Sequence, residues 1–239
     1  MAVTEPVRRF YDVVDVAEVG GTHRIRLDGR EVKTPRGAPV VLPTQAMAQL
    51  IADEWRAQGE RIAPDSMPAA RLANTVLDAP GGQGARSATE IVGYAETDLV
   101  CYRADNPASL VASQKRHWDP LLEWARTTLH LPFVETEGLI HRPQPPGVAA
   151  GVAALVRGLD DFTLAGLAFG SALFGSAVIA LALRAARLTS PEAVEAARVD
   201  EAHQQARWGV DELAAAQLRR LRRDADMLAA WFRALDRRH

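Results

Sequence analysis

The chain has 239 residues, of which 48% are hydrophobic and 24% are charged, and its formal net charge is −2. This composition supports a buried core, and the length suits one large domain or two modest ones. The near-neutral charge excludes a global basic field of the kind that draws proteins to nucleic acid or anionic lipid. The single cysteine, Cys101, excludes an intrachain disulfide and a cysteine-rich zinc site, and its neighbours favour a packed thiol over a nucleophile.

Two segments bear on whether the protein is exported or enters a membrane. Residues 1–6 show neither the apolar core of a secretion signal nor the Arg- and Ser-rich run of a transit peptide, so we expect a protein of the bacterial cytoplasm. Residues 164–183 carry no charge and contain Gly166-x-x-x-Gly170, a spacing that lets membrane helices approach closely. A membrane-associated scaffold is therefore one hypothesis. The Ala, Gly and Ser content of the segment favours a helix buried in a bundle, without stable membrane insertion.

The N-terminal part of the chain begins with a β pattern. Residues 10–19 carry valines among polar residues, and residues 22–32 alternate apolar and polar side chains. Asp28-Gly29 lies within this alternation and predicts a hairpin turn, because both central residues of such a turn need positive φ. Residues 40–42 predict a further short strand.

A helical pattern follows at Thr44, whose side chain is a typical N-cap. Gly59 lies where a left-handed C-cap belongs, and residues 68–77 predict a second short helix. The apolar residues of the first helix recur at helical spacing: Met47, Leu50, Ile51 and Trp55.

Helical periodicity dominates from residue 88 onward, with helices expected over 110–128 and from residue 152. Ser190-Pro191-Glu192 predicts the start of a long charged helix, with proline at its first position and an acid in its first turn. Gly209 is a candidate kink before a last helix.

The pattern as a whole predicts an α+β fold. We expect an N-terminal antiparallel β domain with a helix over residues 1–66, followed by a larger all-helical, orthogonal-bundle-like domain over residues 67–239. Strands do not alternate with helices, so no parallel nucleotide-binding sheet is predicted.

Motifs for cofactor chemistry are missing from the sequence. The run 81–84 lacks the Lys-Ser/Thr of a P-loop, and the histidines include no pair at i, i+4. Asp200 and His203 share a helix face, but no second pair completes a carboxylate metal site. The arginines of residues 219–223 have no interleaved aromatic residues and are followed by Asp224, which is typical of a solvated face. We expect no cofactor, no metal and no nucleic-acid partner.

An acid–base enzyme is a second hypothesis. Asp119 and Glu123 lie one helical turn apart and His117 is close in sequence, so a cleft in which the three converge would permit proton transfer. Such pairs are more often solvated, the chain has no Gly-x-Ser-x-Gly elbow, and Cys101 has no assigned base. The sequence therefore favours a protein that is not an enzyme.

Three strings combine tryptophan with acids and glutamine, as is typical where an apolar ring meets a partner at a polar rim. Packing of these rings between the protein's own helices is the alternative, and the sequence leaves it open. The residues that we predict to bind a partner are Glu54, Trp55, Trp118, Asp119, Asp200, Glu201, Gln204 and Trp208.

The chain resembles the assembly chaperones for the α subunit of F-type ATP synthase over about 200 residues. The resemblance is carried, in order, by Arg9-Phe10-Tyr11, Leu27-Asp28-Gly29-Arg30, Val32-Lys33-Thr34-Pro35, Leu42-Pro43-Thr44, Glu54-Trp55-x-x-Gln58, Met67-Pro68, Leu72-Ala73-Asn74-Thr75, 97–103, 118–122, Asp200-Glu201 and Trp208-Gly209. It implies a β-containing N-terminal domain and a helical C-terminal domain.

The resemblance also implies a function. Such a protein would bind the unassembled α subunit without ATP, shield the surface that later contacts β, and yield when β arrives. We expect it to act as a monomer. It further implies an important acid just before the Gln-x-x-x-Trp-Gly string, which here is Asp200 or Glu201. Ala202 stands where some relatives carry a third acid, so the choice between the two carboxylates stays open.

Overall fold

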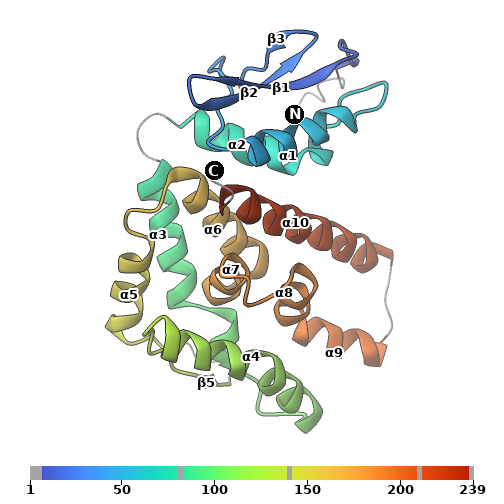
Figure 1. Ribbon diagram of the computed structural model, residues 1–239. Coiled ribbons are helices and arrows are strands. Elements are labelled where there is room, and N and C mark those ends of the chain that lie inside the picture. The colour runs from blue at the N-terminus through green and yellow to red at the C-terminus, as the bar shows by residue number, and fades with distance from the viewer. Residues whose placement is uncertain (1–6, 80–82, 139–141, 209–211, 237–239) are drawn as a thin grey trace. The chain divides into compact units, whose positions relative to one another are not determined.

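The computed structural model describes residues 7–79, 83–138, 142–208 and 212–236 (Figure 1). The chain forms two compact units, one from residues 1–83 with 230–239 and one from residues 84–229. The predicted domain boundary, between residues 66 and 67, precedes the second helix, whereas the first unit includes that helix. The physical reason is local, because the Glu54 carboxylate accepts the backbone N–H groups of Ala69 and Ala70 at 2.7 and 2.8 Å.

The first unit contains an antiparallel sheet of three strands in the order β1-β2-β3. Asp28 and Gly29 form the predicted tight turn, with φ of 48° and 78°. The predicted strand over residues 40–42 is instead a single bridge between His23 and Leu42. Figure 1 shows the sheet beside two helices, α1 and α2. The strands are β1 (Val14–Val19), β2 (Thr22–Leu27) and β3 (Arg30–Glu31).

Helix α1 (Gln45–Arg56) begins as predicted, since the Thr44 hydroxyl accepts the N–H of Met47 at 3.0 Å. The predicted left-handed C-cap at Gly59 is wrong. The helix already ends at Ala57, which has right-handed backbone angles and donates its N–H to Asp53. A 3₁₀ turn, η1 (Pro64–Ser66), leads to α2 (Pro68–Leu77), which has the predicted bounds.

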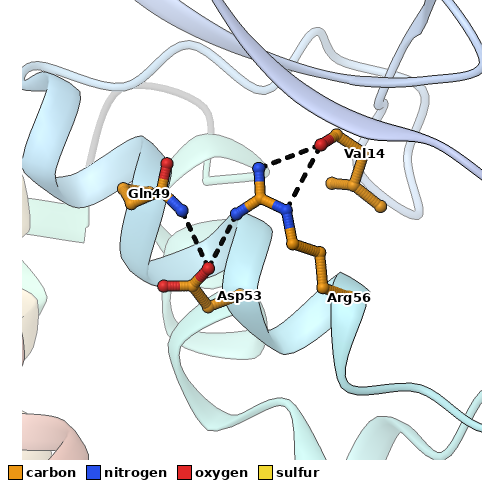
Figure 2. A network of polar contacts seen from close by, with 4 residues as sticks. All are labelled: Val14, Gln49, Asp53 and Arg56. Atoms are coloured by element: carbon orange, nitrogen blue, oxygen red, sulfur yellow. Dashed lines mark hydrogen bonds and ion pairs between the residues drawn. The ribbon is translucent and has the colours of Figure 1, made fainter.

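Arg56 joins α1 to the edge of the sheet (Figure 2). Its Nε and Nη2 atoms donate to the carbonyl oxygen of Val14 at 3.3 and 2.9 Å. Its Nη1 atom contacts the Asp53 carboxylate at 2.7 Å, and the same carboxylate oxygen accepts Gln49 Nε2 at 2.8 Å. Edge-strand carbonyls need partners or water, and here a side chain of the neighbouring helix supplies one of those partners.

The second unit is dominated by helices, which confirms the predicted α+β class. The prediction that this part is all-helical is not fully met, because it also contains two parallel strands of two residues each. Its elements are α3 (Gln83–Glu96), η2 (Leu99–Cys101), β4 (Tyr102–Arg103), α4 (Ala108–Thr128), β5 (Thr136–Glu137), α5 (Pro146–Val156), α6 (Asp161–Phe174), α7 (Ala177–Arg184), α8 (Ser190–Ala197), α9 (Val199–Trp208) and α10 (Glu212–Asp236), the last of which ends in the first unit.

The uncharged segment at residues 164–183 is two helices and not one. Helix α6 ends at Phe174, Gly175 takes the left-handed conformation with φ of 65°, and the Ser176 hydroxyl caps α7. Nearly all of α7 is buried, and Figure 1 shows it among α4, α6 and α8. Within the described ranges, no helix combines the length and the apolar character needed to cross a bilayer.

The long charged helix predicted from Ser190 is also divided. Thr189 and Glu192 form a capping box at the start of α8, and Arg198 leaves helical geometry with φ of −120° and ψ of 17°. Helix α9 then starts at Val199. The predicted kink at Gly209 lies outside the described residues.

Candidate functional site

A cavity of about 600 Å³ lies in the second unit, and we call it the acidic hollow. It brings together four of the predicted partner-binding residues, although they come from α4 and α9, which lie far apart in sequence. The other lining residues are mostly apolar and come from the turns at Leu99 and Gly175, from the ends of α6 and α8, and from α10. The residues that line the acidic hollow are Leu99, Trp118, Leu173, Phe174, Gly175, Ala197, Arg198, Asp200, Glu201, Gln204 and Leu221.

Helix α9 supplies the polar wall of the acidic hollow. Asp200, Glu201 and Gln204 follow at i, i+1 and i+4, a spacing that keeps them on one side of a helix. The Asp200 carboxylate accepts Gln114 Nε2 at 2.8 Å, and Gln114 Oε1 accepts the N–H of Ala104 at 2.8 Å. Gln114 is 2% exposed. Asp200 therefore accepts a hydrogen bond from a buried side chain of α4, and this bond holds α9 against α4.

Glu201 is held less firmly by the rest of the protein than Asp200 is. Its side chain is 47% exposed, and the ion pair with Arg198, at 3.7 Å, is long. Pairs of this kind at the surface contribute little to stability. Gln204 is also exposed. Glu201 and Gln204 are therefore the lining residues of α9 that a partner could engage without breaking the fold.

Trp118 forms the floor of the acidic hollow and is 1% exposed. Its indole N–H donates to the carbonyl oxygen of Ala196 at 2.8 Å, and the Arg103 guanidinium lies 5.3 Å from its ring. The ring thus joins α4 to α8. Asp119, its neighbour, does not line the hollow and forms an ion pair with Arg103 at 2.9 Å.

The first of the three strings, at Glu54 and Trp55, lies in the other compact unit. The Glu54 carboxylate caps α2, and burial raises its pKa to about 7 although the two backbone N–H groups favour the charged form. Trp55 is half-buried against Tyr11, whose hydroxyl donates to the Trp55 carbonyl oxygen at 2.7 Å. Trp208 ends α9, but its side chain lies outside the described residues.

Comparison with known proteins identifies the family. A model of the ATP12 chaperone protein family matches residues 8–126. The crystal structure of Atp12 from Paracoccus denitrificans shares 40% identity with this chain, covers 94% of it and 97% of its own length, and superimposes with a TM-score of 0.85. The chain belongs to the ATP12 chaperone family.

Other relatives agree with this assignment. An Asp-to-Lys mutant of the Paracoccus denitrificans protein matches at 39% identity and a TM-score of 0.85, over 94% of this chain and 97% of the mutant. The Atu1473 protein from Agrobacterium tumefaciens shares 40% identity, with a TM-score of 0.88 over 95% of this chain and 86% of its own. Mitochondrial atp12 from Schizosaccharomyces pombe is 23% identical, over 84% of this chain and 74% of that protein.

An ATP12 chaperone acts in the assembly of ATP synthase and is not an enzyme, and the geometry of the acid–base candidates agrees. Asp119 pairs with Arg103, Glu123 pairs with Arg126 at 2.7 Å, and His117 Nδ1 lies 2.8 Å from the carbonyl oxygen of Ser113. Each group is thus engaged with a different neighbour. Among the described residues, no group of three His, Cys, Asp or Glu side chains could hold a metal ion.

Sequence reasoning missed Asp98, the most deeply buried carboxylate of the ATP12 fold described here. Its oxygens accept the N–H groups of Val100 at 3.3 Å and Val178 at 3.0 Å, so one side chain caps both η2 and α7. Burial raises the pKa of the Asp98 carboxyl to about 6. Cys101 lies at the end of the same turn, η2, and is buried, which confirms the predicted packed thiol. Burial also raises the pKa of this thiol. An acid before a short apolar run was the available signal.

Proposed function

We propose that this ATP12 chaperone binds the unassembled α subunit of F-type ATP synthase, shields the surface of α that later contacts β, and is displaced when β arrives. An unassembled subunit exposes a large apolar interface, which is an aggregation hazard. A chaperone that covers it for a limited time must bind tightly enough to compete with aggregation and weakly enough to be replaced.

The acidic hollow is the observation that carries this proposal. Apolar side chains at Leu99, Leu173 and Leu221, which are each half-buried, offer contact area, and Glu201 and Gln204 offer polar contacts at the wall. Interfaces of this composition combine an apolar centre with a polar rim, and a small number of central residues supply most of the binding free energy. A cationic side chain of α beside Glu201 would fit the charge of the hollow.

Displacement requires no chemical step in this proposal. The β subunit competes for the same surface of α, so mass action releases the chaperone once β is present. ATP hydrolysis is not needed. We propose further that the chaperone acts as a monomer in the bacterial cytoplasm. The bacterial setting is supported by relatives at about 40% identity from Paracoccus denitrificans and Agrobacterium tumefaciens, against 23% for the mitochondrial protein.

The test is suppression of aggregation of purified α subunit, followed by light scattering at an equimolar ratio and without nucleotide. Wild-type chaperone should keep α in solution, and added β should release it. Glu201→Lys replaces attraction by repulsion at the rim of the hollow, and we expect affinity for α to fall about tenfold.

Glu90→Lys is the matched control, because Glu90 is an exposed acid of the same compact unit that lies on α3 and does not line the hollow. It makes the same change in net charge and should protect α as well as the wild type does. Equal protection by wild type and Glu201→Lys would contradict the assigned site. Failure of the wild type to protect α would contradict the proposed function itself.

A further inference from the structure

A second hollow, of about 440 Å³, lies on the other face of α9. Val199, Ala202 and His203 of this helix line it. Successive residues of a helix are turned by about 100°, so these positions are nearly opposite those of Asp200, Glu201 and Gln204. Helix α9 therefore separates two hollows of the same compact unit.

The charge of the second hollow is opposite to that of the first, and we call it the basic hollow. Arg116 of α4 and Arg222 of α10 line it, together with Arg198 at the end of α8, which also lines the acidic hollow and pairs with Glu201 at 3.7 Å. Among the lining residues that the structure describes, Glu195 is the single carboxylate. Guanidinium groups bind carboxylates through two parallel N–H donors, so the exposed Arg116 and Arg222 make this hollow a site for acidic groups.

The floor of the basic hollow includes the apolar side chains of Val194, Val199 and Leu218. His203 is held at one side, with its Nε2 atom 3.0 Å from the Ser109 hydroxyl. This mixture fits a polypeptide, which carries carboxylates and apolar side chains together. Single-stranded nucleic acid needs aromatic rings on which bases stack, and the described lining residues include no Phe, Tyr or Trp.

We propose that the basic hollow binds an acidic segment of polypeptide, with carboxylates against Arg116 and Arg222 and apolar side chains against Leu218. A client that occupied both hollows at once would contact α9 on both faces. It would need a cationic side chain for the acidic hollow and anionic side chains for the basic hollow, in a fixed order. That dual charge requirement would reject chains with the wrong order. The inference rests on the proposed function only where it takes the segment to belong to the client subunit.

The test uses a fluorescein-labelled decapeptide of alternating Glu and Leu as the probe, with the matching Lys-Leu peptide for comparison. Fluorescence anisotropy with the full-length chaperone should show binding of the Glu-Leu peptide and weaker binding of the Lys-Leu peptide. Arg116→Glu/Arg222→Glu should weaken binding of the Glu-Leu peptide about tenfold or more. Arg116→Gln/Arg222→Gln, which removes charge without repulsion, should fall between the two.

Arg219→Glu is the control for a charge reversal outside the hollow, because Arg219 is an exposed arginine of α10 that does not line the basic hollow. It should bind the Glu-Leu peptide like the wild type, and circular dichroism should show that every variant is folded. Equal binding by the wild type and the Arg116/Arg222 variants would overturn the inference. The inference would also be overturned, in favour of nucleic acid, if single-stranded RNA displaced the labelled peptide at a lower concentration than unlabelled Glu-Leu peptide does.

A second readout separates this inference from the proposed function. The Arg116→Glu/Arg222→Glu variant should also protect the α subunit less well in the light-scattering assay, whereas Arg219→Glu should not. Loss of peptide binding with full protection of α would overturn the assignment of the segment to the client. Failure of the wild-type chaperone to protect α would leave the peptide result standing and contradict the proposed function alone.

Discussion

Glu54 in the first compact unit and Glu201 in the second are both acids of a helix in a string that contains tryptophan. Glu54 points to the start of α2, where its carboxylate accepts two backbone N–H groups at 2.7 and 2.8 Å. Glu201 is 47% exposed beside the acidic hollow and makes one ion pair of 3.7 Å. Residue type marks both acids as candidates, whereas their hydrogen bonds show that Glu54 serves the fold and that Glu201 is the one we propose for a partner.

The largest effect is expected at Trp118, on the structural side of this comparison. Trp118→Ala removes a buried ring and leaves the Ala196 carbonyl without its donor, so the free energy of unfolding should fall by about 3–5 kcal/mol. Urea denaturation measures it. Trp124→Ala, at a half-buried site of the same helix, should cost clearly less. Equal costs would show that Trp118 is not the internal support described above.

Asp98 should show the next largest effect. Asp98→Ala leaves the buried N–H groups of Val100 and Val178 without an acceptor, which should cost about 2–4 kcal/mol in the free energy of unfolding. Asp98→Asn keeps one acceptor oxygen and should cost less. Chemical denaturation near pH 7 distinguishes the two variants. An alanine variant as stable as the wild type would contradict the role of Asp98 as a double cap.

Glu54 should show a smaller effect that depends on pH. Glu54→Ala should cost about 1 kcal/mol through loss of the cap, while Glu60→Ala, at an exposed acid, should cost little. Burial raises the Glu54 pKa from 4.5 to about 7, so the folded state binds the proton of this carboxyl more tightly than the unfolded state does. The stability that comes from this tighter proton binding is lost as pH rises from about 4.5 to about 7.

The pH dependence can be measured with Glu54→Gln, which does not titrate. Stability of the wild type should decrease more steeply than that of this variant across the same pH range in urea denaturation. Asp98 titrates in an overlapping range, but it is present in both proteins and cancels in the difference. Parallel pH curves for the two proteins would show that the Glu54 pKa is not raised.

The smallest effect on stability is expected at Glu201. Glu201→Lys should change the free energy of unfolding by no more than about 0.5 kcal/mol, because the group is exposed and its ion pair is long. Thermal and urea denaturation measure this change. A loss of several kcal/mol would place Glu201 with Glu54 among the residues that serve the fold.

Local signals were sufficient to predict most elements. The Asp28-Gly29 turn, the Thr44 cap and the bounds of α2 follow from residues close in sequence, and all three are present. The ends of helices were harder to predict, because α1 already ends before Gly59, and the predicted long helix is divided at Arg198, a residue type that favours helices.

The site was predictable in part. Asp200, Glu201 and Gln204 could be grouped because they lie on one helix face. Their meeting with Trp118 in a hollow depends on contacts between α4, α8 and α9, and no single string records those contacts. The internal role of Glu54 was hidden for the same reason, since its two hydrogen-bond donors are 15 and 16 residues away.

Contact between the α subunit and α9 at the acidic hollow can be measured by hydrogen–deuterium exchange. Exchange should be compared for the chaperone alone and for its complex with purified α subunit. If α binds at the acidic hollow, exchange in the complex should be slower for peptides that cover residues 197–208 and the turns at 99–101 and 173–176, with little change over residues 45–77. Slower exchange confined to residues 45–77, with α9 unchanged, would contradict it.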